Sequence, residues 1–517
     1  MKRTIVGSAA ILALLSASAA WAIPPQKPDR GTAPESKLYD YGVMGPAATP
    51  AIVAAADAAV TPPMAPGPVK PEWASIAANY QPPAWFADAK FGIFMHWGVY
   101  SAAAHGNEWY EKHMYAGKDA DWHATHFGPQ DKVGYKDLIP LFTASKWDPD
   151  AWARLFKAAG ARYVIPTAEH HDNFANWDSA LTPINAVKMG PHRDLIGDLE
   201  TAVHKQGLKF GVSNHGMENF TFIDPDPALD AKLQAEHADL YDPKWAEWYH
   251  VADRSPEAMT RFLTDWVERN LELIDKYHPD ILWWDNGVNL RVLDPLKEHV
   301  AAYYYNRAKQ WGQPVTLSTK WIAMAPSNDD THQVGSVLDF EKVGVRSPRD
   351  IRANQDWEVD DTIGSTWGYT DGMTVASAAQ ILPRLIDTVS KGGNYLLNIS
   401  PMADGTIPRA QQETLLGIGH WLDANGEAIY ATRPWTQFGE GDFRFTTKGA
   451  VLYAIALKWP AGGEATIAAL ARKKVTRVEL LGQSLAFKQD AAGLHIILPA
   501  MAPDELAYAL KITGGIE

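Results

Sequence analysis

Residues 281–287, ILWWDNG, place an acid directly after four large apolar residues. An ionised carboxylate beside an apolar core is costly unless it is paired or hydrogen-bonded. The pattern is therefore typical of a buried strand that ends in a side chain with a chemical task. Other short apolar runs along the chain end in polar residues in the same way.

Eight such runs recur, and helical patterns separate most of them. They begin at Phe91 (FGIFMH), Tyr163 (YVIPTAEHH), Leu208 (LKFGVSNH), Ile281 (ILWWD), Val315 (VTLSTK), Ser336 (SVLDFE), Thr362 (TIGSTWGY) and Asn394 (NYLLNIS). Strands that alternate with helices over this length predict an α/β fold, a (β/α)8 TIM-like barrel. The helices between the last strands are short or missing, so we expect an irregular barrel.

Composition divides the chain into four predicted parts. Residues 1–22 combine a basic start, an apolar run and an Ala-Trp-Ala cleavage site, which predicts a secretory signal peptide. Residues 23–74 are rich in Pro and Ala and are expected to form an N-terminal arm or linker, with regular structure beginning near Trp85. Residues 75–433 are expected to form the catalytic barrel. Residues 434–517 hold short alternating segments that predict a C-terminal antiparallel β-sandwich.

Charge and composition exclude several functions. The 517-residue chain has 47 Lys and Arg against 61 Asp and Glu, a formal net charge of −14. Nucleic-acid binding needs clustered Lys and Arg, so we expect no such partner. The chain has no Cys, which excludes Cys nucleophiles and thiolate metal sites. The signal peptide predicts a secreted or periplasmic protein with no membrane span in the mature chain, and its oligomeric state is not predicted.

In a (β/α)8 barrel the catalytic groups lie at the carboxyl ends of the strands and in the loops that follow. A single histidine at such a place is commonly a buried residue without a role, but here many polar groups converge on one edge. They are His96, Glu169, His170, His171, Asp172, Asn214, His215, Asp285, Lys320, Asp339, Glu341, Trp367 and Tyr369. This convergence predicts a site.

Three reaction classes suit these residues. Imidazoles and a carboxylate could ligate zinc in a metal-dependent hydrolase, although the sequence lacks HxH on the first strand and HExxH anywhere. A phosphate-binding barrel would need a Gly-rich loop after a late strand, but Gly392 and Gly393 precede theirs. A glycosidase needs two carboxylic acids that flank the scissile bond. Asp285 with Glu341 or Glu358 would supply them.

Seven segments resemble the hallmark segments of the α-L-fucosidases of glycoside hydrolase family 29. They are KFGIFMHWGVYS from Lys90, NEWYEKHMY from Asn107, YVIPTAEHHDNFANWDS from Tyr163, RDLIGDLETAVHKQGLKFGVS from Arg193, PDILWWDNG from Pro279, TIGSTWGY from Thr362 and KGGNYLLNISPMADGTIP from Lys391. The resemblance covers roughly residues 75–435. It implies an exo-acting retaining enzyme that releases terminal α-L-fucose from fucosylated glycans through a covalent intermediate, with no cofactor and no metal.

The resemblance also assigns roles. Asp285 corresponds to the nucleophile, while the acid/base is expected at Glu341, with Glu358 second and Asp339 and Glu108 as further candidates. The residues expected to bind the sugar are His96, Glu108, Trp109, His170, His171, Asn214, His215 and Trp367. The segment SNHGMENF departs from the commoner family form, in which many members have an aromatic pair. The resemblance therefore assigns no specific sugar contact to His215. A metal-dependent hydrolase and a non-catalytic fucose-binding protein remain the alternatives.

Overall fold

The computed structural model describes residues 48–320, 323–326, 333–460, 462–502, 506–514 and 516, so the predicted signal peptide lies outside the described residues. A closed barrel of eight parallel strands in chain order forms the centre. The strands are β1 (Phe91–Met95), β2 (Tyr163–Glu169), β3 (Lys209–Asn214), β4 (Ile281–Trp284), β5 (Thr316–Lys320), β6 (Ser336–Glu341), β7 (Trp357–Thr362) and β8 (Asn394–Ile399). The predicted barrel is confirmed.

Helices cover the barrel unevenly. The long ones are α7 (Pro149–Ala158), α8 (Leu195–Lys205), α11 (Pro256–Tyr277), α12 (Asp294–Trp311), α13 (Ala378–Ser390) and α14 (Arg409–Asn425). Within the described residues, no α-helix separates β5 from β6 or β6 from β7. The expected irregularity is therefore confirmed. None of the described helices is both long enough and apolar enough to cross a membrane.

The opening stretch, ILWW, alternates between the two faces of β4. Trp283 lies in the barrel interior, where its ring centroid is 4.8 Å from that of Phe94 on β1. Trp284 faces outward, and its indole Nε1 donates to Asn270 of α11 at 2.9 Å. Side chains alternate along a strand, so Asp285 continues the inward row of Trp283. The four apolar residues are thus buried on both faces of β4, inside the barrel and against α11, and the acid that follows them lies at the mouth of the barrel.

The seventh strand was predicted in the wrong place. It was expected to start at Thr362, but β7 ends there and begins at Trp357. Its acids Glu358 and Asp360 made it resemble an exposed loop. Both are buried in the barrel, where Glu358 accepts a hydrogen bond from Tyr163 at 2.8 Å and Asp360 lies 3.2 Å from the Lys320 ammonium. Pairing inside the barrel offsets the cost of burial, and sequence polarity does not reveal it.

The predicted N-terminal arm is helical in part, contrary to the expected start of regular structure near Trp85. Two helices precede that residue, α1 (Pro50–Ala59) and α2 (Trp73–Asn79). The Thr49 hydroxyl caps α1 and Pro50 opens it, a favoured start for a helix. Helix α1 packs against α11 and α12, and Asp57 pairs with His299 of α12 at 2.7 Å.

A β-sandwich follows the barrel. A six-stranded sheet has the order β14-β13-β17-β11-β10-β9, and a three-stranded sheet has the order β12-β16-β15. The strands are β9 (Arg433–Glu440), β10 (Phe443–Lys448), β11 (Val451–Ala456), β12 (Glu464–Ile467), β13 (Val475–Leu480), β14 (Gln483–Ser484), β15 (Phe487–Asp490), β16 (Gly493–Ile497) and β17 (Tyr508–Gly514). Apolar side chains of both sheets form one core, as predicted.

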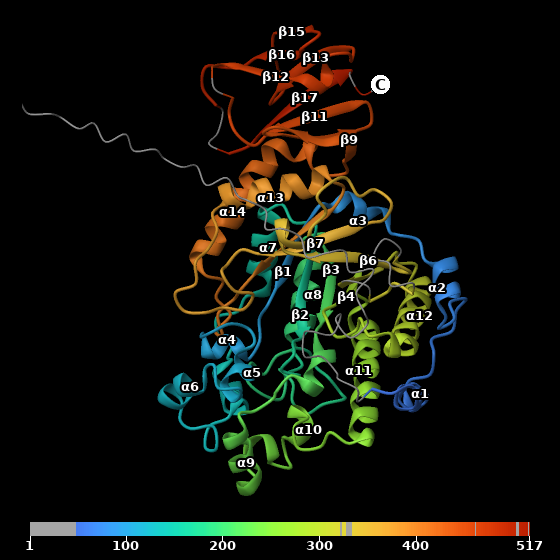
Figure 1. Cartoon of the computed structure of the whole chain (residues 1–517), viewed down its shortest axis with the longest axis vertical. Helices are drawn as coiled ribbons and strands as arrows, with labels where there is room; N and C mark the ends of the chain where they lie inside the picture. The colour runs from blue at the N-terminus through green and yellow to red at the C-terminus, as the bar shows by residue number, and fades with distance from the viewer. Residues whose placement is uncertain are drawn as a thin grey trace, which may run out of the picture.

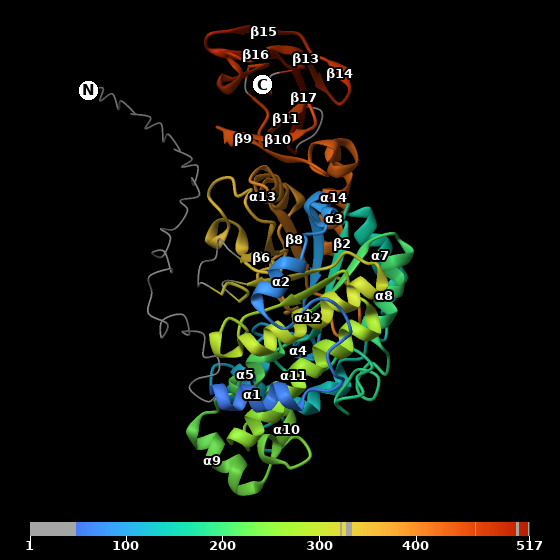
Figure 2. The ribbon, with the colours of Figure 1, turned by 90° about the vertical axis from the view of Figure 1, so that its right-hand side faces the viewer.

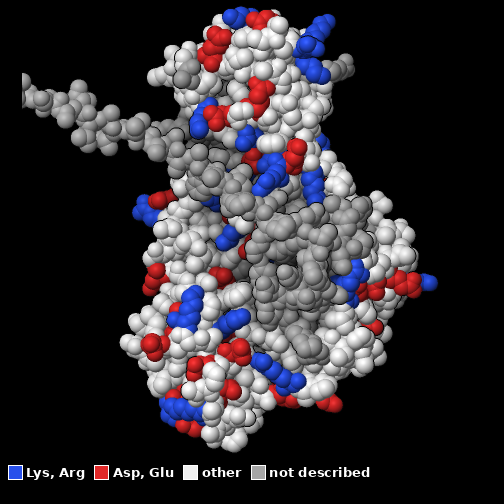
Figure 3. Space-filling model, in the orientation of Figure 1, with Lys and Arg blue, Asp and Glu red and all other residues white. Residues whose placement is uncertain are grey.

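The sandwich lies at the end of the barrel where the strands begin. Helix α3 (Ala84–Ala89), which precedes β1, is on this side in Figures 1 and 2. The helices that follow β1 and β3 lie at the opposite end: α4 (Tyr100–Ala103), α5 (Tyr110–Tyr115), α9 (Pro227–Glu236) and α10 (Ala246–Tyr249). The carboxyl ends of the strands therefore face away from the sandwich. On the face in Figure 3, acidic and basic side chains are interspersed.

Candidate active site

Asp285 lies directly after β4, nearly buried, among three cationic or polar groups. Its Oδ1 is 3.1 Å from the ammonium of Lys320, and its Oδ2 is 3.1 Å from Nδ1 of His215 and 3.5 Å from Nε2 of His171. Burial alone would raise the pKa of this carboxyl, but Lys320 and the two histidines hold the pKa well below its usual range. Asp285 is therefore an ionised carboxylate at neutral pH.

Lys320, the last residue of β5, connects three carboxylates. Besides Asp285, its Nζ lies 3.2 Å from Asp360 of β7 and 3.7 Å from Glu341 at the end of β6. Burial would lower the pKa of this ammonium, but the surrounding carboxylates raise it well above its usual value. A permanent positive charge thus lies between Asp285 and Glu341.

Glu341 is brought to the mouth of the barrel beside Asp285. Both contact the same ammonium, so their nearest oxygens cannot be farther apart than the sum of the two distances from Lys320, 3.1 and 3.7 Å. This limit is compatible with the spacing of about 5–5.5 Å between the two carboxyl groups of retaining glycosidases. The Glu341 side chain is 26% exposed, so it is accessible from solvent.

Glu358 lies deeper in the barrel. It is fully buried and accepts hydrogen bonds from Tyr163 of β2 and Ser318 of β5. Burial raises its pKa to about 7. Asp339 and Asp360 flank it on the neighbouring inward positions. Burial raises the pKa of both carboxyls, and repulsion from Asp360 and Glu358 adds to the rise at Asp339. The structure thus brings Glu341, and not Glu358, into contact with the ammonium that binds Asp285.

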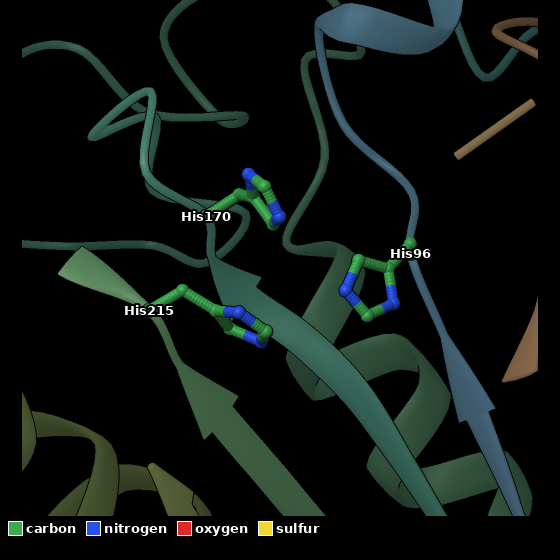
Figure 4. A group of neighbouring side chains, drawn as sticks. All are labelled: His96, His170 and His215. Atoms are coloured by element: carbon green, nitrogen blue, oxygen red, sulfur yellow. The ribbon is translucent and has the colours of Figure 1, made fainter. Parts of the chain in front are cut away.

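Three histidines converge from the first three strands (Figure 4), and one of them, His215, lies 3.1 Å from Asp285. His96 follows β1, His170 follows β2 and His215 follows β3, and all three are buried. Their ring centroids are 5.4 Å apart for His96 and His170, 5.2 Å for His96 and His215, and 4.9 Å for His170 and His215. One ligating atom from each lies within 4.8 Å of the others, so they could hold a metal ion; His171, His215 and Asp285 form a second such group.

His171 has a defined orientation. Its Nδ1 donates to the carbonyl oxygen of His215 at 2.9 Å, so Nε2 faces Asp285. Burial lowers its pKa to about 3, which makes the ring neutral. A neutral imidazole nitrogen and a carboxylate oxygen both accept hydrogen bonds, and a hydroxyl group placed between them would satisfy one of them as a donor.

Aromatic rings and Glu108 form the walls of the site. Glu108 accepts from the backbone N–H groups of Trp367 at 3.1 Å and Gly368 at 3.2 Å, which holds the loop after β7 against the segment after β1. The Trp367 ring lies 5.1 Å from His96, and the Trp109 ring lies edge-on 5.8 Å from His171. The structure thus gathers these predicted residues around the histidines.

Unlike the residues gathered around the histidines, Asn214 has its side-chain amide bonded within the turn that follows β3. Its Oδ1 accepts from the Gly216 N–H at 2.9 Å, and its Nδ2 is 3.4 Å from Glu169. Its backbone carbonyl accepts from the N–H of Asp285 at 3.4 Å. Asn214 therefore anchors the ends of β3 and β4 through its backbone while its amide is engaged by the turn.

Sequence reasoning missed three polar residues. Glu218, four positions after β3, is buried 3.7 Å from His171, and burial raises its pKa to about 8. Asp360 was hidden in the misplaced seventh strand. Asn398 of β8 bonds His96 Nδ1 at 2.8 Å. The same rule of inspecting strand ends would have found Asn398, because it is the penultimate residue of its strand.

Comparison with known proteins agrees with this geometry. The family model for alpha-L-fucosidase matches residues 57–427, and the model for the alpha-L-fucosidase C-terminal domain matches residues 438–513. The chain belongs to the α-L-fucosidase family. The expected enzyme class, a glycoside hydrolase of this family, is thereby confirmed.

Relatives of this α-L-fucosidase family match most of the chain. The tissue alpha-L-fucosidase of Mus musculus is 34% identical over 470 residues, which cover 87% of this chain and 96% of that protein. The same tissue enzyme of Bos taurus is 32% identical over 86% of this chain and 91% of that protein. The crystal structure of Thermotoga maritima alpha-fucosidase has a TM-score of 0.69 and 32% identity, covering 86% of this chain and 100% of that one.

Proposed function

We propose that this chain is an exo-acting, retaining α-L-fucosidase that hydrolyses terminal α-L-fucose from fucosylated oligosaccharides or glycoconjugates. The observation that carries the proposal is an ionised Asp285 and an accessible Glu341 on either side of one buried ammonium. A Thermotoga maritima alpha-fucosidase with the same fold was crystallised with fucose and with a mechanism-based inhibitor, which supports fucose as the sugar.

In the first step, a carboxylate oxygen of Asp285 attacks the anomeric carbon while Glu341 gives its proton to the departing glycosidic oxygen. In the second step, Glu341 takes a proton from water, which displaces Asp285 and restores both groups. Lys320 and His215 keep Asp285 ionised and oriented between turnovers. His96, His170, His171 and Glu108 would bind the sugar hydroxyls, and Trp109 and Trp367 would contact its apolar faces.

We also propose that residues 1–22 are a signal peptide and that the enzyme is secreted or periplasmic. Basic residues, an apolar run and a small-residue cleavage site in this order support export. The barrel would carry the chemistry in residues 75–433, and residues 434–517 would form the sandwich. The two family matches, on either side of residue 433, support this division.

The test of the nucleophile is Asp285→Ala with an aryl α-L-fucoside. We expect turnover to fall by roughly 10⁴-fold or more, in the range seen when a catalytic residue is removed. Azide, a small nucleophile, should restore part of the rate and yield a fucosyl azide identifiable by mass spectrometry. Near-normal turnover in this variant would show that another residue is the nucleophile.

The test of the acid/base compares Glu341→Ala with Glu358→Ala on two substrates. A fucoside with a very acidic leaving group needs little protonation, so Glu341→Ala should lose far less activity on it than on a fucosylated disaccharide. Glu358→Ala should affect both substrates alike. The reverse pattern would transfer the acid/base role to Glu358.

A further inference from the structure

We propose that His96, His170 and His215 form a binding site for a borderline transition-metal cation such as Zn²⁺, and that this cation and the sugar occupy the same space. The statement that they compete rests on the proposed function. Metal binding itself depends only on the three histidines.

The arrangement of the three rings suits one ion. They reach the same space from the ends of three adjacent strands, as Figure 4 shows, and their centroids are 4.9–5.4 Å apart. Zinc binds imidazole nitrogen at about 2.0–2.1 Å, which places the nitrogens of a tetrahedral site roughly 3.4 Å apart. The nitrogens of this cluster lie within 4.8 Å of one another, so small side-chain rotations would complete the coordination.

The hydrogen bonds of His96 direct one lone pair into the site. Its Nδ1 lies 2.8 Å from Oδ1 of Asn398, whose Nδ2 donates to the Trp367 carbonyl at 2.8 Å. That second bond fixes the orientation of the amide, so the Asn398 oxygen must accept and Nδ1 of His96 must carry the proton. The Nε2 atom of His96 is therefore the available ligand.

His215 resembles a metal ligand with a supporting carboxylate. Its Nδ1 donates to Asp285 at 3.1 Å, and its Nε2 is 3.0 Å from the Ser213 hydroxyl. A carboxylate behind a histidine fixes its tautomer and makes it a better ligand, as in zinc proteins. The Ser213 hydroxyl also lies 3.4 Å from the Pro166 carbonyl and from Thr167 Oγ1, so it can turn away and free Nε2.

His170 completes the set. It is only 3% exposed, and its Nδ1 is buried without a hydrogen-bond partner. A buried polar atom without a partner costs free energy, which a ligand or ion in the cluster could recover.

The neighbouring charges limit the affinity. Lys320, 3.1 Å from Asp285, competes for the carboxylate behind His215 and repels a cation. Dedicated zinc enzymes use three protein ligands with an open fourth position, and this cluster has the same number of ligands, so it can bind one ion. Because Lys320 weakens that binding, we expect it to be reversible and the ion to be displaced by the sugar.

The experiment titrates chelator-treated full-length protein with Co²⁺ and Zn²⁺ in the absence of substrate. Co²⁺ should develop the visible absorption of a tetrahedral site at one equivalent, and Zn²⁺ should abolish it. His96→Phe and His170→Gln should each weaken Zn²⁺ binding at least 100-fold by calorimetry. His105→Ala, at a partly exposed histidine outside the cluster, is the control and should bind as the wild type does.

Unchanged Zn²⁺ affinity in both cluster variants, with circular dichroism showing that they are folded, would overturn the site. L-fucose should weaken Zn²⁺ binding, and Zn²⁺ should raise the apparent KM without changing kcat. Independent binding of the two, or activation by Zn²⁺, would overturn the competition. Because binding is measured without turnover, a chain that hydrolysed no fucoside would refute the proposed function and leave the metal site to be judged separately.

Discussion

The barrel and the sandwich bury different kinds of side chain. The sandwich core consists of apolar residues from both sheets, and Thr446 is the one buried polar side chain among its described residues. The barrel interior buries Lys320 together with Asp285, Asp339, Glu358 and Asp360. Burying charges costs free energy that well-packed apolar side chains would not, so a cluster of this kind marks the place where chemistry outweighs stability.

The end of the barrel also differs from the sandwich in what its charges do for one another. Asp285, Asp339 and Asp360 near the mouth are each tied to Lys320 or to a neighbouring acid, so changing one side chain alters the others. Residues of the sandwich core contact apolar neighbours, and their effects should stay local. This contrast can be tested by matched substitutions in the two regions.

Among the substitutions that test this contrast, the largest effect is expected for Lys320→Met. Methionine keeps the length of the side chain but removes the ammonium 3.1 Å from Asp285 and 3.2 Å from Asp360. We expect kcat/KM to fall by about 10²–10³-fold, comparable to the loss of one preorganised electrostatic group. Steady-state kinetics on an aryl fucoside measures this. Lys320→Arg, which keeps the charge, should retain most of the rate, and equal losses in both variants would contradict an electrostatic role.

In the sandwich, Ile467→Ala should show the opposite pattern. Ile467 is fully buried in the core between the sheets, so the cavity should cost about 2–5 kcal/mol of the local unfolding free energy. The carboxyl ends of the barrel strands face away from this domain, so kcat/KM should stay within about twofold at temperatures where the protein is folded. Denaturant unfolding measures the change in unfolding free energy, and steady-state kinetics on the same sample measures kcat/KM. A loss of activity at denaturant concentrations where the variant is still folded would contradict the expectation that substitutions in the sandwich core have only local effects.

Within the barrel, Asp339→Asn and Asp360→Asn form a matched pair with a smaller effect. Burial and repulsion from Asp360 and Glu358 raise the pKa of Asp339 well above its usual value, which favours the protonated form, so an amide of the same size should change kcat less than threefold. Asp360 pairs with Lys320, and its amide should lower kcat about tenfold, or about 1.4 kcal/mol. Equal kcat values in the two variants would mean that Asp360 does not position Lys320.

The sequence was sufficient to predict the barrel because strands such as β1, β4 and β8 are largely apolar, as buried parallel strands are, and because polar residues follow them at regular intervals between helical patterns. The sequence was misleading at β7 because Glu358 and Asp360 are acidic residue types, which are typical of exposed loops. In the fold, their carboxyl groups are buried and are paired or protonated. The strand-end rule found Asp285, Glu341 and Lys320, but it could not show that one ammonium joins them. That fact depends on inter-strand register, which a single sequence does not contain.

The smallest predicted effect lies far from these buried charges, at His204 of α8. Its Nδ1 is 2.7 Å from Glu200 and its Nε2 is 3.7 Å from Asp280. The carboxylates of Asp280 and Glu200 accept from the protonated ring and raise its pKa to about 9 from an unfolded value of about 6.5.

A histidine whose pKa is raised on folding contributes stability in full below pH 6.5 and loses it as the pH rises through 9. The His204 side chain is 41% exposed, so we expect this contribution to be below about 1 kcal/mol. Between pH 6 and pH 9.5 the wild type should therefore lose slightly more unfolding free energy than His204→Gln, measured in urea at low salt. If the difference persisted in high salt, the interaction would not be an exposed ion pair, and the contrast with the buried charges of the barrel, which salt screens much less, would not hold at this site.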